Sequence, residues 1–340
     1  MSEPSQPPDS LDLGAALAGH CDDLLAAAPR LLAMRDAIES QNNLSASQAF
    51  QLHAAVLSFR PDLVIELGRA YGNSTAALHD AALAIGAHTV SVGFEGASGW
   101  SNRTAPRFLA HGVVDERWFD NLTILDQDIR TVDFVPYARD AKRVLVWWDA
   151  HGDDLAWFVL GALLPAIQGK VNVVAVHDIA DSRHEGHDGA YVRTDGMPNF
   201  WQGYLVCPFE EIVPLFDFVS RNGIPFQTAS ASLDELCDRD PVAWSTLEER
   251  FACLPEPLPH RGGGWMWFSV PASGVVFPAT SGEFPSERLA EAEARAATAE
   301  ARAATAETQV ATAEARAVEA EALTGLRGLW RILRRRLLGG

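Results

Sequence analysis

The sequence predicts a doubly wound α/β domain with a mostly parallel sheet, followed by a C-terminal heptad-repeat helix. From Pro61 onward, short apolar runs typical of buried strands alternate with longer runs of helical periodicity. From Glu287 the composition changes to an alanine-rich repeat with a period of seven residues. Two kinds of structure are therefore expected in one chain of 340 residues.

The chain divides into six expected segments. They are a disordered N-terminus (1–10), N-terminal helices (11–60), the main domain (61–275), a linker (276–286), the heptad-repeat helix (287–323) and a basic amphipathic tail (324–340). The main domain alternates strands and helices in a way that fits βαβ units.

The helices and strands of the domain follow from periodicity and from end signals. Residues 11–40 have a helical pattern, and Ser45 with Gln48 fits a capping box that opens a second helix. Further helices are expected over 74–85 and 155–167. Strands are expected at 62–67, 89–92, 122–125, 143–148, 171–176, 224–227 and 265–270, with a long loop over 181–210.

Composition excludes several classes of protein. Hydrophobic residues make up 48% of the chain, which is enough for a core, and no apolar run reaches the length of a membrane span. The net charge of −18 argues against nucleic-acid binding by the main domain. The four cysteines are widely spaced and form no CxxC pair, which is typical of reduced cysteines in a cytoplasmic protein.

Glycines and hydroxyls follow the first expected strand. Glu66 lies next to the end of the apolar run, Gly68 and Gly72 follow with the spacing Gly-x-x-x-Gly, and Ser74 can begin the next helix. We expect the two glycines to let the backbone pass close to a ligand. This spacing differs from the Gly-x-Gly-x-x-Gly of dinucleotide-binding proteins, which disfavours a nicotinamide dehydrogenase.

Polar side chains also follow the other four parallel strands. Glu95 follows the second strand, where it can accept hydrogen bonds from ribose hydroxyls, and Asp128 follows the third, where it can meet an adenine edge. The fourth strand ends in Asp149-Ala150-His151 and the fifth in His177-Asp178. Because the carboxyl ends of parallel strands share one edge, we expect one ligand site there.

Residues 61–180 resemble the core of class I S-adenosylmethionine-dependent methyltransferases, which have a Rossmann-like sheet. Glu66-Leu-Gly through Gly72-Asn-Ser-Thr75 is similar to their first motif, and Glu95 matches their ribose-binding acid. Ala70 stands where that motif has its middle glycine. The run from Asp149 to Asp178 resembles the branch that includes macrocin O-methyltransferase and cephalosporin-hydroxylase-like proteins.

The resemblance implies O-methylation of a saccharide or another small hydroxylated acceptor, in surface-polysaccharide or natural-product biosynthesis. Asp149 and Asp178 would hold Mg²⁺ or Ca²⁺ through oxygen ligands, or would only cap helices and orient loops. His151 or His177 would act as the base, since histidine titrates near neutral pH. A protein that keeps this fold as a binding or scaffold protein without turnover is the alternative.

The C-terminal segments predict location or assembly. Residues 287–321 form heptads that fit either a coiled coil joining copies of the chain or a solvated helix used as a spacer. Residues 324–340 contain five arginines and no acid, with leucines and Trp330 on one helical face. This pattern favours an anionic membrane surface over a partner helix.

Overall fold

The computed structural model describes residues 8–38, 44–93, 99–150, 153–177, 200–201, 204–205, 212–252 and 265–278. All of these residues belong to one compact unit, Met1–Thr280. Glu95, His151 and Asp178 lie outside the described residues, as do the heptad-repeat segment and the basic tail.

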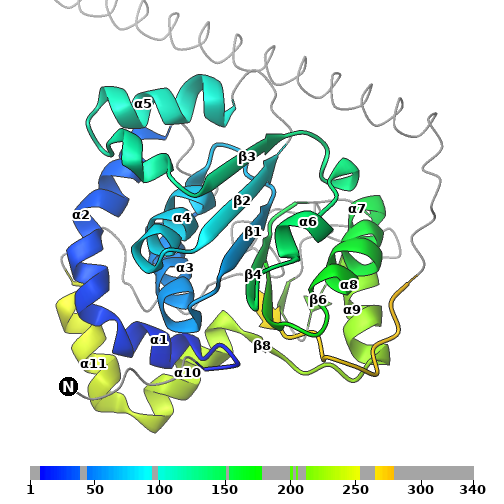
Figure 1. Ribbon diagram of the computed structural model, residues 1–340. Coiled ribbons are helices and arrows are strands. Elements are labelled where there is room, and N and C mark those ends of the chain that lie inside the picture. Colours follow the sequence, from blue (N-terminus) through cyan, green and yellow to red (C-terminus); the bar gives the residue numbers. More distant parts are fainter. Residues whose placement is uncertain are drawn as a thin grey trace, which may run out of the picture. The chain divides into compact units, whose positions relative to one another are not determined.

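A seven-stranded sheet forms the centre of the described unit, in the order β3-β2-β1-β4-β5-β9-β8 (Figure 1). Strands β1 to β5 run parallel, and β9 pairs antiparallel with both β5 and β8. The strands are β1 (Leu63–Leu67), β2 (His88–Gly93), β3 (Leu122–Asp126), β4 (Arg143–Trp148), β5 (Val171–Val176), β8 (Phe226–Thr228) and β9 (Met266–Phe268). The doubly wound, mostly parallel, Rossmann-like sheet is therefore confirmed, and the last two expected strands form its antiparallel edge.

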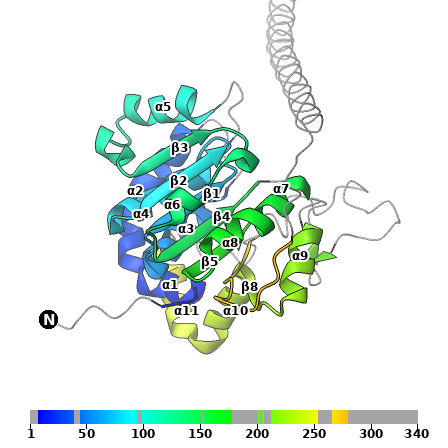
Figure 2. The same ribbon diagram turned by 45° about the vertical axis from the view of Figure 1, so that its right-hand side comes forward.

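Helices cover both faces of the sheet (Figures 1 and 2). Because side chains alternate along a strand, Val64 of β1 packs in one core cluster and Ile65 in the other. The first face is covered by α1 (Leu13–Gly19), α2 (Cys21–Ala37), α3 (Ala46–Phe59), α4 (Asn73–Ile85), α10 (Ala229–Arg239) and α11 (Pro241–Arg250). The second is covered by α7 (Asp153–Phe158), α8 (Leu164–Ile167) and α9 (Ile212–Arg221).

Shorter elements connect these layers. They are α5 (Ala105–Ala110), α6 (Val135–Ala138), the π-helical segments η2 (Trp100–Thr104) and η5 (Val159–Leu163), and the 3-10 helices η3 (Glu116–Phe119) and η4 (Ile129–Thr131). The helix expected over 155–167 is thus found as α7, η5 and α8 in succession. Within the loop expected over 181–210, Phe200–Trp201 and Tyr204–Leu205 pair as the short strands β6 and β7.

The helical run expected over 11–40 is found as two helices, because the chain breaks at His20 between α1 and α2. Asp22 and Asp23 lie in the first turn of α2, where acidic side chains stabilise a helix start. The ring of His20 contacts Asp23 at 2.9 Å and so reinforces this start. The capping box of α3 is confirmed, with both hydrogen bonds between Ser45 and Gln48 present.

A buried carboxylate ties the N-terminal helices to the sheet domain. Asp80 of α4 accepts hydrogen bonds from Arg30 Nε at 2.7 Å and Arg30 Nη2 at 2.9 Å. His53 Nε2 of α3 and Trp118 Nε1 of η3 each lie 3.1 Å from the same carboxylate. Burial would raise the pKa of Asp80, but the hydrogen bonds from His53 and Arg30 outweigh it and hold that pKa well below its ordinary value.

The described residues contain no helix with the length and apolar character needed to cross a membrane. Among the residues that the structure describes, Cys21 and Cys237 form no disulfide bond.

Candidate functional site

The carboxyl ends of β1 and β4 lie side by side where the strand order of the sheet reverses. Strand β1 pairs with β2 on one side and with β4 on the other. Leu67, the last residue of β1, is in register with Val92 of β2 and Trp148 of β4. Ligands of doubly wound sheets bind at such a switch point, so the residues that follow these strands form the candidate site.

The loop from Gly68 to Gly72 joins β1 to α4 through a left-handed backbone. Gly68, Ala70 and Gly72 have φ angles of 99°, 44° and 89°. Ala70 adopts this region although it is not glycine, at a cost of about 1–2 kcal/mol. Gly72 is the N-cap of α4, so the loop delivers the start of that helix to the switch point.

Both glycines of this loop pack against protein, whereas we expected them to bring the backbone close to a ligand. A methyl group on Gly68 would overlap the carbonyl oxygen of Asp149, and one on Gly72 would overlap the indole ring of Trp100. The need for glycine is therefore explained by close packing of the loop against the end of β4 and against η2.

Glu66 fastens the start of α4 to the sheet from a fully buried position. Its carboxylate accepts hydrogen bonds from Ser74 Oγ at 2.5 Å, Thr75 Oγ1 at 2.6 Å and Ser91 Oγ at 2.5 Å. Burial raises the pKa of Glu66, against these hydrogen bonds and the charge of Arg69, which lower it. Glu66 and Ser74, both predicted to bind a cofactor, thus contact each other beneath the loop.

Arg69 is a buried cation that contacts the ends of β2 and β3. Its Nη1 donates to the carbonyl of Ser91 at 2.8 Å and to that of Leu125 at 3.4 Å, and its Nη2 pairs with the carboxylate of Asp126. Only 1% of the Arg69 side chain is exposed, against 35% for Asp126. The pair therefore presents an anchored carboxylate at the rim of the candidate site.

Asp128, which was predicted to contact an adenine edge, contacts Arg130 within the turn that begins η4. It caps η4 by accepting from the backbone N–H of Arg130 at 2.9 Å, and the guanidinium of Arg130 contacts both of its oxygens. Burial would raise the pKa of Asp128, but the hydrogen bonds from Arg130 outweigh it and lower the pKa.

Asp149, His177 and Gln48 form a connected row of polar groups at the ends of β4 and β5. His177 Nδ1 lies 3.0 Å from Asp149 Oδ1, and His177 Nε2 lies 3.0 Å from Gln48 Nε2 of α3. The side chain of His177 is 3% exposed, against 17% for Asp149. The structure thus brings together two of the predicted site residues and adds a third group from a helix far away in the sequence.

Of the predicted metal ligands, only Asp149 is described. Within the ranges given above, no group of three His, Cys, Asp or Glu side chains is arranged to hold a metal ion. The positions of Asp178, His151 and Glu95, which belong to the predicted site, stay predictions from the sequence.

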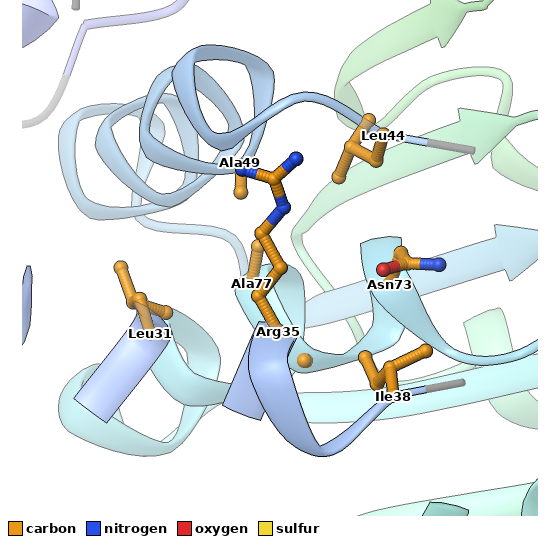
Figure 3. A pocket seen from close by; sticks show the side chains of 8 residues that line it. Leu31, Arg35, Ile38, Leu44, Ala49, Asn73 and Ala77 are labelled. Carbon is orange, nitrogen blue, oxygen red and sulfur yellow. The ribbon is translucent and has the colours of Figure 1, made fainter. Parts of the chain in front are cut away.

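A small pocket opens beside the start of α4 (Figure 3). Arg35 extends across it from α2 toward α3, and Asn73 of α4 lies on another side. The lining is otherwise apolar and consists of Leu31, Ile38, Leu44, Ala49, Ala76 and Ala77. Its apolar lining distinguishes this pocket from the polar ends of the strands.

Gln48, Arg69 and Trp100 were not among the site residues predicted from the sequence. The capping box alone accounted for Gln48, although its amide also reaches His177. A role for Arg69 could have been predicted from the sequence, because a charged residue directly after Gly68 in a short strand–helix turn must either face solvent or pair with an acidic side chain. The role of Trp100 could not have been predicted in this way, because its packing on Gly72 depends on how the segment after β2 folds back.

No family model and no curated protein matches this chain. Among solved structures it is similar to a methyltransferase of Podospora anserina with bound SAH, with 13% identity, 66% of this chain and 94% of that chain covered, and a TM-score of 0.38. A putative O-methyltransferase from Klebsiella pneumoniae has 12% identity, 74% and 96% coverage and a TM-score of 0.42. The O-methyltransferase TomG from Streptomyces achromogenes has 17% identity, 66% and 84% coverage and a TM-score of 0.35. At these identities and TM-scores the likeness carries no argument about function, which has to be inferred from this chain's own side chains.

Proposed function

We propose that this protein is an S-adenosylmethionine-dependent methyltransferase that methylates a hydroxyl group of a small acceptor. The observation that carries the proposal is the left-handed Gly68–Gly72 loop at the switch point, with Asp149 directly beside it. A glycine-containing strand–helix turn at this place is where doubly wound proteins bind nucleotide-like ligands.

The described residues fit such a cofactor better than a dinucleotide. In a dinucleotide-binding turn, glycine lets the backbone approach a pyrophosphate. Here the indole ring of Trp100 covers Gly72, so that approach is blocked. The cofactor would be held by the Gly68–Gly72 loop, by Glu95 at its ribose and by the rim near Asp126 and Asp128. When bound, it supplies a methyl group activated by a positively charged sulfur.

The reaction requires a proton acceptor near the acceptor hydroxyl. The hydroxyl oxygen would receive the methyl carbon, and the electron pair of the broken carbon–sulfur bond would remain on the sulfur of the cofactor. The hydroxyl proton must then leave. Asp149 is a partly exposed carboxylate directly beside the Gly68–Gly72 loop, and it would take that proton. His177 engages both ring nitrogens in contacts within the protein, while His151 is the other candidate base from the sequence.

The proposed ligands of a divalent metal ion are Asp149 and Asp178. Carboxylate oxygens suit Mg²⁺, and Asp149 is the one of these two carboxylates that the structure describes. The acceptor class, a saccharide or related hydroxylated compound, is proposed from the resemblance to macrocin O-methyltransferase-like proteins. Transfer of a labelled methyl group to a panel of saccharides and phenols, read by mass spectrometry, tests it.

Titration calorimetry of the full-length chain with S-adenosylmethionine, and then with NAD⁺, tests the cofactor. Binding of the first and not of the second is expected, and the reverse result, or no binding of either, would contradict the proposal. Glu95→Ala should weaken S-adenosylmethionine binding by about 1–3 kcal/mol, because polar contacts are lost. Glu116→Ala removes an exposed acid from η3 and serves as the matched control, with unchanged affinity.

We also propose that residues 324–340 bind an anionic membrane surface and that residues 287–321 act as a spacer or as an oligomer contact. Five arginines without an acid support the membrane over a partner helix, since each arginine adds about 1 kcal/mol near anionic lipid. Sedimentation with anionic liposomes at low salt should deplete the full-length chain from the supernatant, but not a variant truncated after Gly282. Equal amounts of both in the supernatant would contradict the proposal.

A further inference from the structure

The capping box of α3 fixes which end of the Gln48 amide faces the candidate site. Ser45 N–H donates to Gln48 Oε1 at 3.0 Å, and Ser45 Oγ accepts from the N–H of Gln48 at 3.1 Å. A backbone N–H can only donate, so the amide atom that it contacts must be the oxygen. The NH₂ group of Gln48 therefore faces His177.

This orientation determines where His177 carries its proton. Gln48 Nε2 lies 3.0 Å from His177 Nε2, and an amide nitrogen can only donate. His177 Nε2 must then be unprotonated, which leaves the proton of the neutral ring on Nδ1. That nitrogen lies 3.0 Å from Asp149 Oδ1, so its N–H donates to the carboxylate. All hydrogen bonds in the row run in one direction, from the start of α3 to the end of β4.

The ring of His177 has little freedom to leave this geometry. Its side chain is 3% exposed, and its ring centroid lies 5.3 Å from that of Trp147, which is fully buried. Its backbone N–H donates to the carbonyl of Trp148 at 2.9 Å. Rotation of the ring by a half-turn would break the contacts with both Gln48 and Asp149.

We propose that Gln48 is a positioning residue, which selects the Nδ1–H tautomer of His177 and thereby orients Asp149 toward the acceptor hydroxyl. The role of Asp149 in this inference rests on the proposed methyltransferase function. His177 is then also a positioning residue, and not the general base that the sequence suggested. One carboxylate oxygen, Oδ1, is committed to His177, and Oδ2 takes no part in the row.

The test is long-range ¹H–¹⁵N correlation NMR of the full-length protein labelled with ¹⁵N-histidine, at about pH 8, above the ordinary pKa of histidine. The signal of His177 is assigned by its loss in His177→Gln. The wild type should show this ring protonated at Nδ1 alone. A wild-type ring protonated at Nε2 would overturn the inference without any further variant.

Two substitutions at the same helix end separate tautomer selection from helix capping. Gln48→Glu replaces the donor with a carboxylate, which should draw a proton onto His177 Nε2. Ser45→Ala loses the hydroxyl but keeps the backbone N–H that orients Gln48, so the Nδ1–H tautomer should persist. An unchanged His177 spectrum in Gln48→Glu, or the same change in Ser45→Ala, would contradict the proposal.

Affinity for S-adenosylmethionine and the methyl-transfer rate complete the test. Gln48→Glu should bind S-adenosylmethionine as the wild type does, while kcat falls about tenfold to a hundredfold, the loss typical of a removed orienting partner. Ser45→Ala should keep kcat within about twofold. A kcat of Gln48→Glu equal to that of the wild type would refute the orienting role. If the wild type itself does not bind S-adenosylmethionine, the proposed function fails, whereas the NMR result still decides the tautomer.

Discussion

Asp80→Asn should be among the most destabilising conservative substitutions in the N-terminal half of the chain. Asp80 is buried between α2, α3 and η3, and it accepts from Arg30, His53 and Trp118. Asparagine has the same size but offers one acceptor oxygen and an NH₂ group. That NH₂ group would face donors, so at least one buried donor is left without an acceptor.

The magnitude follows from burial. Breaking a buried charge pair by removing one partner costs about 3–5 kcal/mol. The Arg30 side chain is 45% exposed and recovers part of this loss by hydration, so we expect about 2–4 kcal/mol of lost unfolding free energy. Urea unfolding followed by tryptophan fluorescence measures it, with Trp118 lying directly beside the substituted carboxylate.

Asp217→Asn is the matched control, and pH supplies a second check. Asp217 pairs with Arg221 at 2.6 Å, but the two side chains are 40% and 78% exposed, so we expect a loss below about 0.5 kcal/mol. Because the pKa of Asp80 is lowered in the folded protein, its stabilisation is present above the unfolded value of about 3.9 and is lost as the pH falls toward the folded pKa. The difference between wild type and Asp80→Asn should shrink over that interval. Equal losses in the two variants, or a difference independent of pH, would refute this reasoning.

Three further predictions concern the candidate site. Gly68→Ala should abolish S-adenosylmethionine binding, whereas Gly86→Ala should leave it unchanged. Both positions have positive φ, but only at Gly68 would the added methyl group collide with backbone atoms. Equal calorimetric affinities of the two variants would contradict this prediction. Glu66→Gln should gain stability relative to the wild type as the pH rises above about 4.3, the unfolded pKa of glutamate. The folded pKa of Glu66 is raised, so the wild type loses stability as the pH rises from the unfolded to the folded pKa. Urea unfolding at several pH values measures the difference between the two proteins, and a difference that does not change with pH would argue against the raised pKa. If Asp149 and Asp178 share a metal ion, EDTA should abolish methyl transfer and Mg²⁺ restore it, while full activity in excess EDTA would leave Asp149 without a metal role.

Local patterns in the sequence were enough to predict most of the elements. The bounds of β4 and β5 agree with the expected runs 143–148 and 171–176, because both strands are buried on both faces and are apolar except at Arg143 and Asn172. The capping box at Ser45 was also predicted, since both of its hydrogen bonds join residues three positions apart. The class of the sheet followed from the alternation of strands and helices.

The partners of the polar side chains depended on the tertiary structure. Gln48 and His177 are 129 positions apart, and Arg69 and Asp126 are 57 apart. Whether such residues meet depends on the order of the strands and on the path of each crossover, and hydrophobic periodicity specifies neither. The structure therefore brings Asp149 and His177 into contact at the predicted edge of the sheet, and it gives Glu66 and Gly72 neighbours that the sequence did not indicate. A strand's period says which side chains are buried, but only the packed structure decides what they are buried against.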